Sequence, residues 1–370
     1  MTSNAHPTPA DPIAPPGAIV VHTFARSDVG RTREHNEDAY VVADLETGEP
    51  VLFRSVLSQR GSGRGTLFMV ADGMGGAAAG EIASEMAVEV VLQQMRRRWS
   101  TQPTADPLAF VAALKASTEA ANATIHRYAA DHPELRGMGT TATVAGLLGD
   151  TLYLAQVGDS RAYLVRDGVA MQITKDQSLM QKLIEAGEIS VEEAEQSDRR
   201  NIILQALGPD SAVKIDLTHQ AVRRGDVLIL CSDGLSGLVR ADVIAQAVRE
   251  EPDLDAVCDR LIDTANDAGG PDNITVVAAR FDGTGLPLPS EEDSIGHRVF
   301  GNPDASTPTP VPVPTLPERV AAETAESPAP RDVGLPDEDR RRRGVLYIRL
   351  LAGAGMLLTV VLLWEILTKL

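Results

Sequence analysis

Proline is distributed very unevenly along the chain, and this distribution limits where a folded core can lie. Five of the 23 prolines fall within residues 1–20 and eleven within residues 281–340, which leaves only seven for the long stretch between them. Proline lacks the backbone N–H that helices and central strands need. We therefore predict a folded domain at residues 18–282, between a disordered tail at residues 1–17 and a Pro-rich, disordered linker at residues 283–339.

The C-terminal segment differs from everything before it. Four arginines at residues 340–343 precede a mainly apolar run, which carries no charge from residue 344 to residue 364 except for Arg349. A helix of this length spans about 31 Å, close to the thickness of a bilayer core. The alternative is an amphipathic or core helix, but the segment has no polar face. We predict a single transmembrane helix at about residues 345–366. Basic flanks stay on the cytoplasmic side, so the domain is expected at the cell membrane, facing the cytoplasm.

Charge and composition exclude several classes of protein. The chain has 34 basic and 52 acidic residues, a formal net charge of −18, and only 4% aromatic residues. Such a chain repels phosphate backbones and has few side chains on which bases could stack, so we expect no nucleic-acid partner. Its two cysteines, Cys231 and Cys258, cannot form a disulfide framework or a four-thiolate zinc site. Buried, reduced thiols in a reducing compartment are the expected outcome.

Strand-like and helix-like patterns alternate through the predicted domain. Residues 81–99 carry apolar side chains mainly four apart, which is the spacing of a helix, and residues 107–130 begin with a proline suited to the first helical turn. Sheets packed on each other with helices outside are the arrangement that this order favours. Further strands are expected at 51–57, 66–72, 140–149, 151–158, 161–168, 169–174, 226–234 and 273–281, and further helices at 241–250 and 253–267.

Acidic residues recur beside glycine at the ends of the predicted strands. Asp72 and Asp233 each follow an apolar strand and precede a glycine, and Glu37 and Asp272 lie in similar acidic clusters. A single Asp-Gly pair is most often only a turn. Brought together, however, these four carboxylates carry four negative charges, which two divalent ions would cancel. Carboxylate-only clusters suit Mg²⁺ or Mn²⁺, and no Cys–His spacing indicates zinc.

Six motifs resemble, in order, those of the metal-dependent Ser/Thr protein phosphatases of type 2C (the PPM family), particularly its bacterial members. The resemblance covers about residues 22–282 and implies a four-layer α+β fold. In that fold a central β-sandwich of two antiparallel sheets is flanked by helix pairs on both faces. The motifs are residues 27–38 (SDVGRTREHNED), 71–76 (ADGMGG), 139–142 (GTTA), 157–161 (VGDSR), 232–235 (SDGL) and 272–275 (DNIT).

The resemblance also implies roles for individual residues. Asp72, Asp233 and Asp272 would hold one Mn²⁺ or Mg²⁺ ion, and Glu37, Asp72 and the Gly73 carbonyl a second. Asp159 with Asp233 corresponds to a weaker third-ion position. Asp38 would orient the metal-bound water, and Arg33 would bind the substrate phosphate through its planar fork. The implied reaction is direct attack on phosphoserine or phosphothreonine by a water or hydroxide that bridges the two ions.

Two positions depart from some members of the family, and two features stay open. Met74 stands where some members have a histidine proposed as general acid, and Gly237 stands where some have an extra aspartate for a third ion. Residues 179–201 resemble a mobile flap of the bacterial members, with a charged surface helix pair as a compatible alternative. Gln177, which lies just before that segment, receives no role from the sequence.

Three functions remain to be distinguished. The first is an active phosphatase of phosphorylated Ser/Thr proteins, which could oppose a Ser/Thr kinase at the same membrane. The second is a catalytically weak pseudophosphatase that serves as a membrane-tethered binding module. The third is an unrelated two-metal nuclease, which the charge of −18 disfavours. Intact acidic residues at 37, 72, 233 and 272 favour the active enzyme.

Overall fold

The computed structural model describes residues 17–301 apart from 52–53, 60–62, 76–78, 100 and 103. The expected tail up to residue 16, most of the expected linker and the whole expected transmembrane helix lie outside these residues. None of the helices in the described part of the chain has the length and apolar character needed to cross a membrane. The membrane helix at about 345–366 therefore stays a prediction.

Two antiparallel sheets form the centre of the domain. The first sheet contains, in spatial order, β10 (Val169–Gln172), β9 (Arg161–Arg166), β12 (Val227–Cys231), β13 (Ile274–Asp282), β1 (Ile19–Asp28) and β4 (Arg54–Gln59). The second contains β11 (Asp216–Ala221), β8 (Thr151–Val157), β7 (Ala142–Leu148), β5 (Thr66–Met74), β2 (Asp38–Asp44) and β3 (Glu49–Pro50). A short strand, β6 (Gly139–Thr140), pairs with the end of β5. Every pairing between these strands is antiparallel.

Several strands are apolar without alternation because both of their faces are covered. The first six residues of β5, from Thr66 to Ala71, are all buried. One face of this strand contributes Phe68 to the core between the sheets, where its ring meets that of Phe281 edge to face at 6.4 Å. The other face contributes Leu67 and Met69 to a separate core beneath helices. A strand buried on both sides reads as a continuous apolar run.

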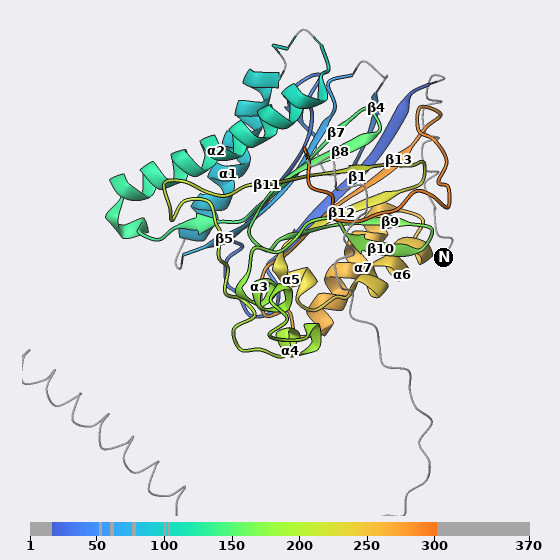
Figure 1. Ribbon diagram of the computed structural model, residues 1–370. Coiled ribbons are helices and arrows are strands. Elements are labelled where there is room, and N and C mark those ends of the chain that lie inside the picture. Colours follow the sequence, from blue (N-terminus) through green and yellow to red (C-terminus); the bar gives the residue numbers. More distant parts are fainter. Residues whose placement is uncertain are drawn as a thin grey trace, which may run out of the picture. The chain divides into compact units, whose positions relative to one another are not determined.

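A helix pair covers the outer face of each sheet, as Figure 1 shows. Helices α1 (Ala79–Trp99) and α2 (Pro107–Asp131) cover the second sheet, and α6 (Ala241–Glu250) and α7 (Leu254–Asp267) cover the first. Asp106 caps α2 by accepting a hydrogen bond from the Ala109 N–H at 2.8 Å, directly before Pro107. The predicted four-layer arrangement is confirmed.

Both cysteines lie in the core between the first sheet and its helices. Cys231 ends β12 and Cys258 lies on α7, and both are buried, unpaired thiols. Burial raises the pKa of Cys231 to about 12 and also raises the pKa of Cys258. The expectation of buried, reduced thiols is confirmed.

Short helices gather near one end of the sandwich (Figure 1). They are α3 (Leu179–Glu185), α4 (Val191–Glu195) and α5 (Asp233–Ser236), while a 3₁₀ turn, η1 (Pro133–Leu135), follows α2. Ser178 and Ser190 cap α3 and α4, and Ser190 forms a reciprocal capping box with Glu193. Residues 179–201 thus contain the helix pair that the sequence allows, and we call them the flap segment.

The folded part of the chain extends beyond the boundary expected at residue 282. Residues 283–301, which the sequence assigns to the linker, pack against the domain instead. Leu286 is only 1% exposed, and Phe300 donates a backbone hydrogen bond to the Leu217 carbonyl at 2.9 Å. Segments of this composition can fold when they complete an existing edge, and here residues 298–300 cover the outer strand β11. The boundary at 282 was wrong for these residues.

Two leucines of this segment give a matched test of its packing. We expect Leu286→Ala to lower the free energy of unfolding by about 3 kcal/mol, because it removes a fully buried side chain. Leu288→Ala should change it by less than about 0.5 kcal/mol, since Leu288 is 66% exposed. Urea denaturation of both variants measures the difference. Two neutral substitutions would mean that the segment does not contribute to the fold.

Candidate metal centre

Six predicted site residues come together at one end of the sandwich, although they come from four separate segments of the chain. Arg33 and Glu37 lie on the loop between β1 and β2, and Asp38 begins β2 directly opposite Asp72 of β5. The remaining two are Asp233, the first residue of α5, and Asp272, which lies just before β13. The Arg33 guanidinium donates to Asp272 Oδ2 at 2.9 Å. Asp38, Asp233 and Asp272 all act electrostatically on Asp72, which places the carboxylates in one cluster.

Asp38 is held by two hydroxyl groups from the opposite sheet. Ser232 Oγ and Thr275 Oγ1 each donate to Asp38 Oδ2 at 2.7 Å. Burial raises the pKa of Asp38 to about 7, and these two hydrogen bonds work against that rise. The carboxyl group therefore has a fixed orientation and a pKa near neutrality.

Asn273 fixes the loop that carries Arg33 and Glu37. Its amide nitrogen donates to the Val29 and His35 carbonyls, both at 2.9 Å, and its side-chain oxygen accepts from the Glu37 N–H at 2.8 Å. One side chain thus satisfies three backbone groups of the loop. This residue follows Asp272 directly, so the loop and the Asp272 segment are held together as a unit.

Glycines allow Glu37 to approach the second sheet closely. The Gly73 N–H donates to the Glu37 carbonyl at 3.1 Å, and a Cβ at Gly73 would lie 2.5 Å from that oxygen. A Cβ at Gly80, near the N-terminus of α1, would lie 2.8 Å from Glu37 Oε2. The carboxylate therefore rests against the first turn of α1, whose exposed N–H groups favour a negative charge.

Burial and, after it, the charges of neighbouring acids disfavour the anionic form of the carboxylates in the cluster. Burial, followed by the charges of its acidic neighbours, raises the pKa of Asp72 well above its ordinary value. Burial and then the charge of Asp233 raise the pKa of Asp159 to about 8, and burial and then Asp272 raise the pKa of Asp233. A hydrogen bond between Asp72 and Asp233 partly offsets the last of these shifts. The cluster is stable at neutral pH only with bound protons or cations.

The donor set has the chemistry that divalent cations of the Mg²⁺ and Mn²⁺ type prefer. Every predicted ligand is an oxygen atom, and Asp159, which is only 7% exposed, has an Oδ1 atom with no hydrogen-bond partner. No three His, Cys, Asp or Glu side chains of the described residues already form an ion cage. In the structure, Asp272 instead engages Arg33, and Asp233 engages Asp72. The residues fit the ions, while the ligand roles of Glu37, Asp72, Gly73, Asp159, Asp233 and Asp272 stay predictions.

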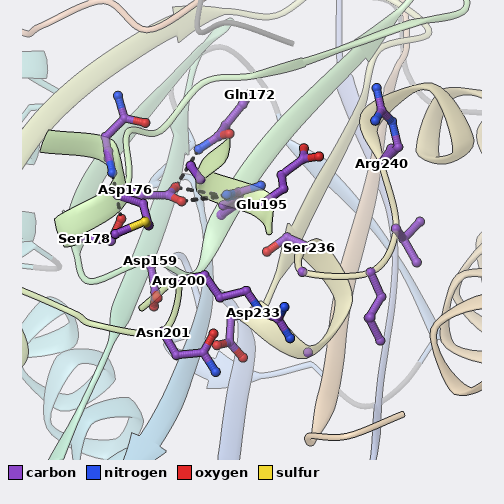
Figure 2. Close-up of a pocket in the computed structure, with 18 of the residues that line it drawn as sticks. Asp159, Gln172, Asp176, Ser178, Glu195, Arg200, Asn201, Asp233, Ser236 and Arg240 are labelled. Carbon is purple, nitrogen blue, oxygen red and sulfur yellow. Dashed lines mark hydrogen bonds and ion pairs between the residues drawn. The ribbon is translucent and has the colours of Figure 1, made fainter. Parts of the chain in front are cut away.

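A cleft of about 690 Å³ opens beside the cluster. Arg33, Asp159, Asp233 and Asp272 line one part of it, and the flap segment lines another. Figure 2 shows Arg200, from the flap segment, extending toward Asp233. The side chain of Arg33 is 46% exposed, so a cation is available at the side of the cleft where the carboxylates lie.

Met74 and Gly237, the two positions that depart from some members of the family, each lie in a defined part of the structure. Met74 lies at the end of β5, paired with Gly139 of β6. Gly237 lines the cleft, and its N–H donates to the Asp233 carbonyl at 2.7 Å. A Cβ at this position would lie 2.9 Å from that same oxygen, so a larger residue would require the turn after α5 to shift.

Gln177 has contacts that its sequence position did not reveal. Its side-chain oxygen accepts from the Gly158 N–H at 3.0 Å, and its side-chain nitrogen donates to the Lys214 carbonyl at 3.2 Å. Its own N–H donates to the Gly158 carbonyl at 2.9 Å, and its carbonyl accepts from the Leu204 N–H at 2.8 Å. Gln177 therefore joins the loop that carries Asp159 to the residues that lie just before and just after the flap segment. Ser232, Thr275 and Asn273 belong to quoted motifs, but their roles also emerge only from these contacts.

Comparisons with known proteins agree with this geometry. Residues 55–277 match the family model described as protein phosphatase 2C. The Serine/threonine protein phosphatase PstP of Mycobacterium tuberculosis is 38% identical over 261 residues, which is 70% of this chain but only 45% of the relative. The Serine/threonine phosphatase stp of Listeria monocytogenes is 36% identical, and the match covers 71% of this chain and 96% of the relative.

A solved structure is similar over the same region. It is the catalytic domain of the serine/threonine protein phosphatase PstP in complex with two manganese ions. It is 37% identical with a TM-score of 0.58, and the match covers 71% of this chain and 99% of that one. That structure is therefore similar to this chain both in fold and in sequence.

The raised pKa of Asp159 predicts how the free energy of unfolding depends on pH when a chelator keeps metal ions from binding. The unfolded chain loses the proton near pH 4 and the folded chain only at about pH 8, so wild type loses stability as pH rises between these values. We expect Asp159→Asn to gain stability relative to wild type from about pH 5 to about pH 8, by at most ~1.4 kcal/mol per pH unit. Urea denaturation in EDTA measures this, with the exposed Asp263→Asn as control. A difference that is constant or falls with pH would contradict the assignment.

Proposed function

The chain belongs to the protein phosphatase 2C family, and from this premise we propose that it hydrolyses phosphoserine and phosphothreonine in proteins. The single observation that carries the proposal is the gathering of Asp72, Asp233 and Asp272 with Arg33 at the side of a cleft. Acidic groups for metal ions and a cation for phosphate are the components that hydrolysis of a phosphate ester requires.

Two Mn²⁺ or Mg²⁺ ions are the proposed cofactors. Asp72, Asp233 and Asp272 would hold one, Glu37, Asp72 and the Gly73 carbonyl the other, and Asp159 would contribute to a weaker third position. When bound, the ions supply a water of lowered pKa and offset the charge that develops on the phosphate. The two manganese ions of the PstP structure support this assignment.

The remaining roles fall to side chains whose surroundings suit them. Asp38 has one carboxylate oxygen fixed by Ser232 and Thr275, which leaves the other to accept from and orient a water molecule. Arg33 can bind two phosphate oxygens with its planar guanidinium, at the cost of its contact with Asp272. Neither thiol takes part, because both cysteines are buried and neither lines the cleft.

A pseudophosphatase is the alternative within the same family. A binding module has no reason to keep buried carboxylates that raise each other's pKa, since that arrangement lowers the stability of the folded chain. The active enzyme accounts for this unfavourable arrangement and is therefore the proposal that we favour.

Replacing one predicted ligand distinguishes the two. We expect Asp233→Asn to reduce Mn²⁺-dependent turnover of a phosphothreonine peptide to less than about a tenth of wild type, because loss of a ligand weakens a metal-assisted step by several kcal/mol. Calorimetric titration with Mn²⁺ should show weakened binding in the same variant. Asp263→Asn, an exposed aspartate on α7, serves as the control. Absence of Mn²⁺-dependent turnover by wild type would favour the pseudophosphatase, and turnover that EDTA leaves unchanged would indicate an unrelated activity.

The proposed setting is the cytoplasmic face of the cell membrane, with residues 345–366 as a single-pass anchor. The support is the apolar run after four arginines, since basic flanks stay in the cytoplasm. Phosphorylated proteins at that surface are the proposed substrates, and a Ser/Thr kinase acting there is the proposed opposing partner. The unpaired cysteines suit a reducing compartment.

Membrane fractionation tests the anchor. We expect the full chain to sediment with membranes and to resist extraction by high salt, because an apolar span is not released by screening of charge. A chain that ends at residue 339 should remain in the soluble fraction with unchanged specific activity on a small phosphopeptide. Release of the full chain by salt alone would show that the segment does not span the bilayer.

A further inference from the structure

The cleft beside the carboxylates continues well beyond them. Its far part lies between the flap segment and the turn after α5, above strands β9 and β10. Figure 2 shows residues of this part, among them Gln172, Asp176 and Ser178, on the side away from Asp233. The cleft is therefore larger than a phosphate group needs, and its far part has room for another chemical group.

The charged groups on the floor of this far part are already paired with each other. Arg161 donates to Asp176 through Nε at 3.0 Å and through a terminal nitrogen at 2.7 Å. Gln172 donates to Asp176 Oδ1 at 2.8 Å, and Arg161 also donates to the Tyr163 hydroxyl at 3.1 Å. The floor thus carries no net charge, and a charged ligand would find no unpaired opposite charge on it.

Apolar side chains line much of the far part, together with polar side chains such as Gln181, Ser236 and Arg240. The apolar ones form three pairs, one pair each from α3, α4 and the turn after α5. The six residues are Met180, Ile184, Val191, Ala194, Leu238 and Val239. An uncharged side chain with a large apolar surface matches walls of this kind.

The position of the far part identifies the source of that side chain. It opens into the same cleft as Arg33, Asp233 and Asp272, so a substrate with its phosphate at the carboxylates has its neighbouring residues at the entrance. An extended chain advances about 3.4 Å per residue, so the residues that flank the phosphorylated one lie along the cleft on either side of the carboxylates. Glu195, Arg200 and Asn201 also line the cleft, and their polar side chains can hydrogen-bond the backbone of a bound peptide.

We propose that the far part of the cleft is a specificity subsite that binds a large apolar side chain one or two positions from the phosphorylated residue. This proposal rests on the proposed phosphatase function and adds to it a class of preferred substrate. The paired charges of the floor and the apolar walls carry it together.

A peptide series tests the subsite. Each peptide contains one phosphothreonine, with leucine placed in turn at each of the two positions before and after it, and serine elsewhere. We expect one leucine position to raise kcat/KM at least about tenfold over the all-serine peptide, which is the discrimination that an apolar pocket gives. Aspartate or lysine at that position should give no such gain. p-Nitrophenyl phosphate, which has no flanking residues, reports the basal activity.

A pair of substitutions locates the effect. Ile184→Ser introduces a hydroxyl into the wall and should reduce the preference for leucine several-fold without changing turnover of p-nitrophenyl phosphate. Val191→Trp should fill the far part and have the same selective effect. Val169→Ser is the matched control, because Val169 is 56% exposed on β10 and does not line the cleft.

The outcomes distinguish the subsite proposal from the phosphatase function on which it rests. Turnover of p-nitrophenyl phosphate with less than twofold preference among the peptides would overturn the subsite and leave the phosphatase function standing. A preference for aspartate would overturn it in favour of recognition by Arg200. Absence of any Mn²⁺-dependent hydrolysis would remove the phosphatase function and the subsite together.

Discussion

The burial of several carboxylates that also repel one another is the constraint on which the rest of this structure depends. Asp72, Asp159 and Asp233 are each less stable as anions in the folded chain than in water, so the fold must hold them together against a force that separates them. Two sheets fixed face to face provide that rigidity, because the segments that carry the acids begin or end at strands of the sandwich. Hydroxyl and amide groups of Ser232, Thr275 and Asn273 then connect the two sheets at the cluster itself.

The same fold neutralises a buried acid where no binding is needed. Asp226 is fully buried, and Arg166 donates to both of its carboxylate oxygens, at 2.8 and 2.6 Å. Asp159 is almost as deeply buried, yet one of its oxygens has no partner. Because an arginine pairs with one buried acid and leaves an oxygen of the other without a partner, the unpaired oxygen of Asp159 is better explained by a ligand than by tolerance of poor packing. The contrast within one domain makes the cluster at the cleft a candidate site independently of any motif.

The sequence predicted those helices and strands whose own residues show a recognisable spacing, cap or apolar run, without reference to the rest of the fold. Helices α1, α2, α6 and α7 have helical spacing or caps, and strands such as β5 and β12 are short apolar runs before an aspartate. Strands β1, β2 and β11 were not predicted from the sequence. Strand β11, for example, reads DLTHQA, and only its neighbours β8 and residues 298–300 make it a strand. The acidic residues of the site were found by type, but contacts such as Arg33 with Asp272, which are 239 positions apart, depend on the whole fold. The role of Gln177 was missed for the same reason.

The placement of the two thiols has a consequence for how this protein responds to oxidants. Peroxides and similar oxidants attack the thiolate form of cysteine, and susceptibility follows both thiolate content and exposure. Burial raises the pKa of Cys231 to about 12 and raises that of Cys258 as well, so at neutral pH both are almost entirely protonated and out of contact with solvent. Enzymes that remove phosphate with a cysteine nucleophile lose activity when that residue is oxidised. No cysteine lines the cleft or belongs to the carboxylate cluster, so oxidation of a thiol is not a route by which the proposed activity would be lost.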